Sequence, residues 1–394
     1  MRAARIVLSW AVVIALAACD GPAPTTASDV PATGPVTAPN VTCSDTAFLV
    51  SWIEEPAENP RLRFARFDEA GFSAPRTVIE NRPLLVNWAD FPSLLSLGDG
   101  RLAAQWLERS AGASFAYGIR IATSTDGGTT WSEPFRPHVD DPKAEFGFVS
   151  LVDDGRGLVA VWLDGRGLDR EGRGVMELRS RVWRGGEWSA ETVLDGDVCS
   201  CCQTSGALAA QGVVVAYRDH TGPLRDIALV GVDGAEPLTP RPLHADGWEI
   251  AGCPVNGPAL AAQGGTVAVA WYTEARGEPR VLLAFSHDDG RTFDEPVRVD
   301  DGAALGRVHL AMLDDGAAVV SWLEGPADGA AIVRARRFDT EGTPRHTWDV
   351  GRTRGARSSG FPRLAVCGSQ IAVVWTDPGP PSRVRVSILP GTSS

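Results

Sequence analysis

A short motif recurs seven times between residues 43 and 392, and it constrains the fold more than any other feature of the chain. An apolar run ends in an aromatic residue and is followed by an acid, as in LVSWIE, AAQWLE and VAVWLD. The aromatic residues are Trp52, Trp106, Trp162, Tyr217, Trp271, Trp322 and Trp375, at spacings of 54, 56, 55, 54, 51 and 53 residues. Such a period indicates one repeat architecture rather than several independent domains.

Each period contains the pattern of four short strands. A second strand follows the aromatic motif, as at 117–124, and a Gly-rich turn leads to a third. A fourth strand ends at a turn such as Gly98-Asp99-Gly100, and the body of the chain has no helical periodicity. The sequence therefore predicts an all-β β-propeller of four-stranded blades, with seven blades favoured and six as the alternative. The last period lacks a fourth strand, which we expect Val41-Thr42-Cys43 to supply.

Composition and charge narrow the class of partner. The chain is 44% hydrophobic and 22% charged, as globular proteins are, and its formal net charge is -12. With no strong basic run to offset this charge, nucleic acid and anionic lipid are poor candidates as partners.

The N-terminus carries the pattern of an export signal. Arg2 and Arg5 precede an apolar run from Ile6 to Ala18, which is too short to span a bilayer. The run closes with Leu16-Ala17-Ala18-Cys19, which resembles the bacterial lipobox, so residues 1–18 are predicted to be a lipoprotein signal peptide. The resemblance implies that Cys19 is lipidated and that the chain is anchored in the cell envelope facing the periplasm. Asp20 slightly favours retention at the inner membrane.

The segment that follows is rich in Pro, Thr and Ala. We expect residues 19–40 to form the lipidated cysteine and a flexible tether, and residues 41–394 to form the propeller. The propeller would then lie outside the cytoplasm, where cysteines can pair as disulfides.

Two turns point to a family. The segments STDGGTTW at 124–131 and SHDDGRTF at 286–293 fit the S-x-D-x-G-x-T-W/F pattern of the Asp box. Their defining residues are Ser124, Asp126, Gly128 and Trp131, and Ser286, Asp288, Gly290 and Phe293. The chain thus resembles the sialidase-like (BNR/Asp-box repeat) propellers, and in particular proteins labelled exo-alpha-sialidase. Asp boxes are structural, because the Asp and Ser side chains can cap backbone N–H groups and Gly takes the positive φ.

The seven cysteines fall into three groups, of which Cys19 in the lipobox is the first. Cys43 and Cys367 lie near the two ends of the propeller, and a disulfide between them would close the ring and stabilise it by about 4–5 kcal/mol. Four more are Cys199, Cys201, Cys202 and Cys253. Aligning ALAAQG at 207–212 with ALAAQG at 259–264 makes Cys201 and Cys253 equivalent positions in neighbouring blades, so we expect them to lie close together.

The four central cysteines allow three interpretations. Paired disulfides are favoured in an oxidising compartment. A C-x-C-C arrangement with a distant cysteine could instead bind Cu(I) or zinc, with His220 and His244 as candidate nitrogen ligands. A redox-active thiol pair is the third interpretation.

Blade four also breaks the repeat, because Tyr217 replaces the recurring tryptophan. The candidate catalytic residues of this region are Arg218, Asp219, Arg225 and Glu249. Tyr217, His220, Asp226 and Asn256 join the four cysteines on the expected binding face. The alternative is an inter-blade ion-pair network. The acids after each aromatic residue are expected to be architectural, with a cation site as the minority interpretation; they are Glu54, Glu108, Asp164, Asp219, Glu274, Glu324 and Asp377.

The catalytic pattern of sialidases is not found. Their F/Y-R-I-P arginine motif is absent, and the stretch that corresponds to it is Val41-Thr42-Cys43-Ser44-Asp45. The nucleophilic tyrosine of sialidases lies late in the chain, whereas the last tyrosine here is Tyr272. The fold resemblance therefore does not carry the activity.

Three hypotheses follow. The preferred one is a lipid-anchored propeller that binds a protein, a glycan or a metal without glycosidase turnover. The second is an exo-alpha-sialidase-like glycoside-processing enzyme, and the third is a copper- or zinc-handling lipoprotein.

Overall fold

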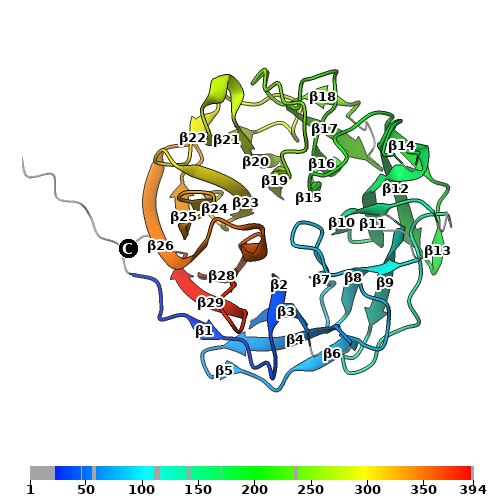
Figure 1. Cartoon of the computed structure of the whole chain (residues 1–394), viewed down its shortest axis with the longest axis vertical. Helices are drawn as coiled ribbons and strands as arrows, with labels where there is room; N and C mark the ends of the chain where they lie inside the picture. The colour runs from blue at the N-terminus through cyan, green and yellow to red at the C-terminus, as the bar shows by residue number, and fades with distance from the viewer. Residues whose placement is uncertain are drawn as a thin grey trace, which may run out of the picture.

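The protein is a seven-bladed β-propeller. The computed structural model describes residues 23–391 except 46, 56–58, 111–115, 140–142, 170 and 235–237. The described residues form seven antiparallel sheets that stand around one axis, in chain order (Figure 1). This confirms the prediction of seven blades and rules out the alternative of six.

Each blade runs from an inner strand beside the axis to an outer strand at the rim (Figure 1). Blade 1 contains β2 (Val36–Ser44), β3 (Ala47–Glu54), β4 (Arg61–Asp68), β5 (Gly71–Phe72) and β6 (Arg76–Ile79). Blade 2 contains β7 (Ser93–Ser96), β8 (Leu102–Arg109) and β9 (Tyr117–Ser124). Blade 3 contains β10 (Phe146–Asp153), β11 (Leu158–Asp164), β12 (Glu177–Arg184), β13 (Glu187–Trp188) and β14 (Thr192–Asp195). Blade 4 contains β15 (Ser205–Ala209), β16 (Gly212–Arg218), β17 (Ile227–Val232) and β18 (Arg241–Pro242).

The remaining three blades complete the ring. Blade 5 contains β19 (Ala259–Gln263), β20 (Thr266–Thr273), β21 (Arg280–Ser286) and β22 (Val297–Arg298). Blade 6 contains β23 (Ala304–Met312), β24 (Ala318–Glu324), β25 (Ala330–Phe338) and β26 (Pro344–Arg354). Blade 7 contains β27 (Arg363–Cys367), β28 (Gln370–Asp377), β29 (Arg383–Pro390) and β1 (Ser28–Asp29). Among the described residues, η1 (Gly165–Gly167) and η2 (Ala275–Gly277) are single-turn 3-10 helices in loops from second to third strands. A third, η3 (Arg357–Ser359), lies in the linker between blades 6 and 7.

The core lies between the blades. Seven apolar clusters each join one blade to the next, and every repeated aromatic residue packs against the blade that precedes its own. These aromatic residues end the second strand of each blade and are at most 1% exposed. Because burying such a ring removes 150–250 Å² from water, the repeated motif holds the sheets face to face.

The ring closes through the N-terminal segment. Ser28 pairs with Val386 and Asp29 with Arg385, so β1 is the outer strand of blade 7 and lies beside β29 (Figure 1). The expectation that residues 41–43 supply this strand is wrong, because they belong to β2, the inner strand of blade 1. The boundary expected at residue 41 is wrong as well, since Val30 and Val36 are buried in the cluster between blades 7 and 1.

A disulfide joins the two blades that meet at this closure. Cys43 is the next-to-last residue of β2 and Cys367 ends β27, and their sulfur atoms are bonded to each other, as the sequence predicts. The two inner strands of the first and last blades are therefore linked covalently as well as by packing.

The two faces of the ring carry different loops. We call "lower face" the face of the turns that join first to second and third to fourth strands, where the backbone N–H of Gly127 donates to the carbonyl of Gly100. The loops from second to third strands and the linkers between blades lie on the opposite, upper face. The Cys43–Cys367 disulfide is on the lower face, and the residues around Cys199 are on the upper face.

None of the helices in the described ranges is both long and apolar enough to cross a bilayer. The predicted signal peptide and Cys19 lie in residues 1–22, outside the described residues.

Candidate functional site

The cysteine turn lies where the linker from blade 3 enters blade 4. Val198 forms a bridge with Asp219, and the backbone N–H of Cys199 donates to the carbonyl of Arg218 at 3.0 Å. These bonds fix the start of the turn against the end of β16. The turn then leads into β15 through Gln203, whose side-chain oxygen accepts the N–H of Gly257 at 3.0 Å.

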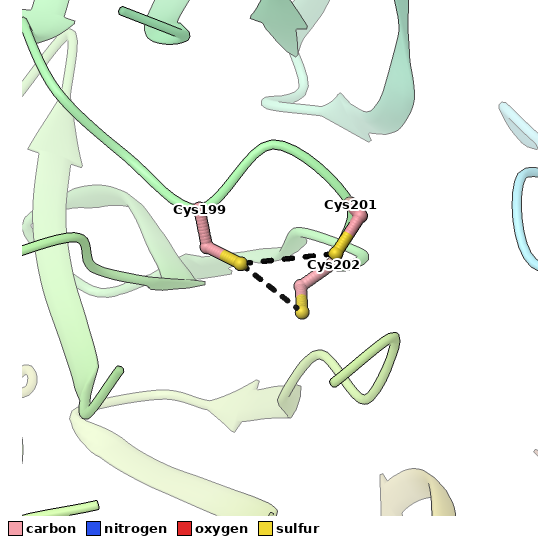
Figure 2. A group of neighbouring side chains, drawn as sticks. All are labelled: Cys199, Cys201 and Cys202. Carbon is pink, nitrogen blue, oxygen red and sulfur yellow. Dashed lines mark hydrogen bonds between the residues drawn. The ribbon is translucent and has the colours of Figure 1, made fainter. Parts of the chain in front are cut away.

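Three sulfur atoms converge inside this turn. The Sγ atom of Cys199 lies 3.6 Å from that of Cys202 and 3.9 Å from that of Cys201 (Figure 2). Among the residues that the structure describes, these three form the group of potential metal-ligating atoms that lie within 4.8 Å of one another. Cys199 and Cys202 are 4% and 2% exposed, so the cluster is largely shielded from solvent.

Cys201 is bonded to Cys253, in the linker that enters blade 5. This confirms that the two equivalent positions of neighbouring blades lie together. The favoured interpretation of two disulfides is wrong for the other pair, because Cys199 and Cys202 are free thiols. The four central cysteines thus comprise one disulfide and two buried thiols in contact.

The surroundings of the two thiols shift their pKa values in opposite directions. The hydrogen bond with Cys202 lowers the pKa of Cys199 to about 6, against the effect of burial, and the charges of Arg218 and Arg225 act in the same direction. Burial raises the pKa of Cys202 well above its ordinary value. A depressed first thiol is typical of C-x-x-C turns. Residues 199–202 have this spacing, and the sequence analysis missed it because Cys201 stands inside the motif.

Arg218 is a structural residue in this geometry. It is 1% exposed, and its guanidinium donates to the carbonyl oxygens of Asn256 at 2.7 and 3.0 Å and of Tyr272 at 2.8 Å. A further bond goes to the carbonyl of Arg225, and the charge lies 4.8 Å from the ring centroid of Trp248. The expected alternative of an ion-pair network is replaced by bonds to carbonyls, which hold the linker of blade 5 against blade 4.

The other catalytic candidates are engaged in loop structure or exposed. The Asp219 carboxylate accepts the hydroxyl of Thr221 at 2.8 Å, and Arg225 donates to the carbonyl of Gly222 at 2.7 Å. Asp226 accepts the backbone N–H groups of Gly247 and Trp248, both at 3.0 Å, and Glu249 is exposed. The structure does not gather Asp219, Arg225 and Glu249 around the axial cavity.

The two candidate histidine ligands are held by aspartates. His220 Nδ1 lies 2.6 Å from Asp197 Oδ1, and His244 Nδ1 lies 2.8 Å from Asp246 Oδ1. Neither belongs to the group of three sulfur atoms. A four-coordinate site with histidine nitrogen is therefore not assembled here.

Three of the repeated acids, Glu108, Asp164 and Glu324, bind the aromatic residue of their own strand. The indole N–H donates to the acid two residues later in Trp106, Trp162 and Trp322, at 3.0, 2.9 and 2.9 Å. Tyr217 and Trp271 differ, because they donate to Asp195 at 2.6 Å and Asp246 at 2.7 Å, acids outside their own strands. These acids have an architectural role, as the sequence predicts.

The S-x-D-x-G turns on the lower face are self-contained. Ser124 Oγ accepts the N–H of Gly128 at 2.9 Å, and Asp126 accepts the N–H of Thr130 at 2.9 Å. That backbone bond lowers the pKa of Asp126 to about 2. Ser286, Asp288 and Gly290 repeat the arrangement. These residues lie on the face opposite the cysteine turn.

The linker between blades 1 and 2 reaches the axis of the ring (Figure 1). Residues 80–92 leave blade 1 and project toward the centre of the ring (Figure 1). The carbonyl of Ala89 accepts the Gln203 amide of blade 4 at 2.6 Å, and the ring of Trp88 stacks on Phe361 near blade 7 at 5.9 Å. Asp90 Oδ1 accepts the N–H of Phe148 in blade 3 at 2.9 Å. We call residues 80–92 the axial linker.

Below the axial linker lies a cavity of about 250 Å³, lined by the inner strands. Three buried polar atoms beside it have no hydrogen-bond partner among the described residues: Asp90 Oδ2, Gln105 Oε1 and Arg363 Nε. Burial raises the pKa of Asp90 to about 7 and lowers that of Arg363 to about 9. The sequence carries no signal for these residues, because Asp90 in the axial linker, Gln105 in β8 and Arg363 in β27 belong to no motif.

Comparisons with known proteins identify the class of fold. No protein-family model matches the chain, and no curated protein matches it in sequence. The leech intramolecular trans-sialidase is similar in structure with a TM-score of 0.51 and 12% identity, over 84% of this chain and 80% of that one. The Penicillium chrysogenum alpha-L-arabinanase gives 0.54 and 11%, over 94% and 99%. The GH93 alpha-L-arabinofuranosidase of Fusarium graminearum gives 0.54 and 12%, over 93% and 98%.

This chain therefore has a sialidase-like β-propeller fold. At these identities the likeness describes the fold alone, and the chemistry must come from the side chains. On the upper face, the cysteine turn brings three sulfur atoms together, two of them free thiols.

Proposed function

We propose that this chain is a lipid-anchored protein of the bacterial cell envelope whose propeller binds a soft metal ion at the cysteine turn, without glycosidase turnover. The observation that carries the proposal is the contact of two buried free thiols, Cys199 and Cys202, whose sulfur atoms lie 3.6 Å apart. Thiolate sulfur selects Cu(I) and zinc over hard cations. The separation of 3.6 Å between these two sulfur atoms is close to the edge of a metal–thiolate polyhedron, about 3.8 Å for bonds of 2.3 Å.

The donor set favours Cu(I) over zinc. Zinc in proteins takes four ligands, usually thiolate and imidazole. Here Cys201 is held in a disulfide, and His220 and His244 are bonded to aspartates. Two thiols remain, Cys199 and Cys202, and a low-coordinate Cu(I) ion is the metal that such a pair fits.

Most of the candidate catalytic groups are already bonded to other parts of the chain, which argues against glycosidase turnover. Arg218 is saturated by carbonyl oxygens, so it does not offer a free fork to a substrate carboxylate. The tip of the axial linker is bonded to blades 3 and 4 beside the axial cavity, where the fold would place a substrate. The lipid anchor is proposed from the lipobox at Leu16–Cys19.

The metal proposal is tested with the full chain, extracted from membranes in detergent without reductant and handled under anaerobic conditions. Wild-type protein is expected to retain one Cu(I) per chain against the competing chelator bathocuproine disulfonate. The Cys199→Ser and Cys202→Ser variants should lose this stoichiometric binding, whereas Ser200→Ala, in the same turn, should keep it. Equal copper retention by the cysteine variants would contradict the proposal.

Two further measurements test the other parts. Fluorogenic sialosides and arabinofuranosides should not be cleaved, and cleavage that is lost in Arg218→Ala would show an enzyme. A Cys19→Ser chain should no longer incorporate labelled palmitate and should leave the membrane fraction. If it remains lipidated, the anchor lies elsewhere.

A further inference from the structure

The cysteine turn places a free thiol in contact with a disulfide. Cys199 Sγ lies 3.9 Å from Cys201 Sγ, the inner sulfur of the Cys201–Cys253 bond, and 3.6 Å from Cys202 Sγ. The attacking sulfur is thus already in contact with the disulfide sulfur at which exchange begins. The same turn therefore holds an attacking thiol, a target disulfide and a second thiol able to resolve the product.

The four cysteines that take part in the exchange differ in burial. Cys199 and Cys202 are buried, Cys201 is half-buried and Cys253 is exposed. Cys253 lies in the exposed segment 251–253, where a side chain added at Gly252 would meet no atom within 4 Å. A thiol released at Cys253 thus has room to leave, while Cys199 is held in place by the carbonyl of Arg218.

We propose that the cysteine turn exchanges its disulfide internally, giving two isomers of which only one binds the metal. This inference rests on the proposed function, since it states how that site is regulated. In the first isomer Cys201 is bonded to Cys253, and Cys199 and Cys202 are thiols that take Cu(I). In the second isomer Cys199 is bonded to Cys202, and both ligands are lost because a disulfide sulfur is not a thiolate.

The exchange needs no external oxidant or reductant. The Cys199 thiolate attacks Cys201 Sγ, the Cys201–Cys253 bond breaks, and the Cys253 thiolate leaves and takes up a proton. The Cys202 thiolate then attacks Cys199 Sγ and expels Cys201, which also takes up a proton. Each step forms one S–S bond and breaks one, and the molecule has one disulfide and two thiols at the turn throughout.

Metal and exchange compete for the same electrons. A Cu(I) ion bound to Cys199 and Cys202 occupies the sulfur lone pairs that attack and resolution require. By linkage, metal binding holds the molecule in the first isomer, and exchange to the second lowers the apparent metal affinity.

The test is alkylation of the full, non-reduced chain with iodoacetamide, followed by reduction, labelling of the remaining cysteines with N-ethylmaleimide, and peptide mapping by mass spectrometry. Because alkylation of Cys253 is irreversible, it draws the exchange forward. We expect Cys253 to be alkylated in the metal-free wild type, at least tenfold less in the Cu(I)-loaded protein, and not in Cys199→Ser. Cys43 and Cys367 are the internal control, since the free cysteines of the described chain lie on the other face.

A second variant keeps the test independent of a failure of Cys199→Ser to fold. Cys202→Ser lacks the resolving thiol, so it should accumulate a Cys199–Cys201 disulfide, found by mapping without reduction. If Cys253 stays unalkylated in the metal-free wild type and no Cys199–Cys201 link forms in Cys202→Ser, the exchange is overturned, even where one Cu(I) is bound. If Cys253 is alkylated through Cys199 but Cu(I) is not retained, the exchange stands, and the proposed metal function fails together with its regulation.

Discussion

The carboxyl group of Asp90 is the feature whose removal has the most calculable effect on stability. The axial linker holds this side chain at 3% exposure, with Oδ1 bonded to the N–H of Phe148 and Oδ2 without a partner. Burial raises its pKa to about 7, and the nearby Glu145 carboxyl adds to this. In the unfolded chain an aspartate has a pKa of about 3.9.

The sign of the pH effect follows from proton counting. Between about pH 4 and pH 7 the folded protein holds a proton on Asp90 that the unfolded chain has lost, so stability falls as the pH rises through this window. A shift of about three units corresponds to about 4 kcal/mol at pH 8 and to less than about 1 kcal/mol at pH 4. The Asp90→Asn variant keeps an oxygen for Phe148 and cannot ionise, so it escapes this loss.

We therefore expect Asp90→Asn to be more stable than wild type by about 4 kcal/mol at pH 8 and nearly equal to it at pH 4. Urea unfolding followed by tryptophan fluorescence at the two pH values measures the difference. Glu69→Gln, an exposed carboxyl on the lower face, is the matched control and should show no such dependence. An Asp90→Asn advantage that is the same at both pH values would refute the reasoning, because Asp90 would then titrate alike in both states.

Three other substitutions test the scaffold. Cys43→Ser removes the bond that closes a sequence separation of 324 residues and should lower the free energy of unfolding by about 5 kcal/mol; an unchanged urea midpoint would contradict this. Arg218→Met leaves carbonyl oxygens unpaired and should cost about 3 kcal/mol in the same assay, whereas a stable variant would mean that these bonds contribute little. Glu324→Met removes the acceptor of the Trp322 indole and should cost about 1–3 kcal/mol, and the prediction is wrong if thermal melts of the two proteins coincide.

The fold was predictable because its signal is repeated. Seven aromatic positions at a period near 54 residues fix seven blades, and equivalence between repeats places Cys201 beside Cys253 before any coordinates are known. Ring closure was only partly predictable. The Cys43–Cys367 pair follows from position in the chain, but β1 does not, because two residues in a Pro- and Thr-rich segment carry no strand pattern.

The candidate site was harder to predict for a physical reason. Sequence spacing brings Arg218 to the upper face, but its partners are backbone carbonyl oxygens, which no residue pattern encodes. Cys199 and Cys202 are free because the folded chain places Cys201, and neither of them, against Cys253. This placement is a property of the fold and not of the sequence pattern. Asp90 and Arg363 become unusual only because distant strands bury them together beside the axis.

The hydrogen bonds that Tyr217 and Trp271 make outside their own strands affect how the ring unfolds locally. Trp106, Trp162 and Trp322 bond an acid of their own strand through the indole N–H. Tyr217 instead reaches Asp195 of blade 3, and Trp271 reaches Asp246 in the linker leaving blade 4. Residues that share a hydrogen bond show non-additive effects on stability. Blades 3, 4 and 5 should accordingly open as a single cooperative unit in hydrogen exchange. The cysteine turn lies at the centre of this unit, so its backbone should open only when all three sheets open.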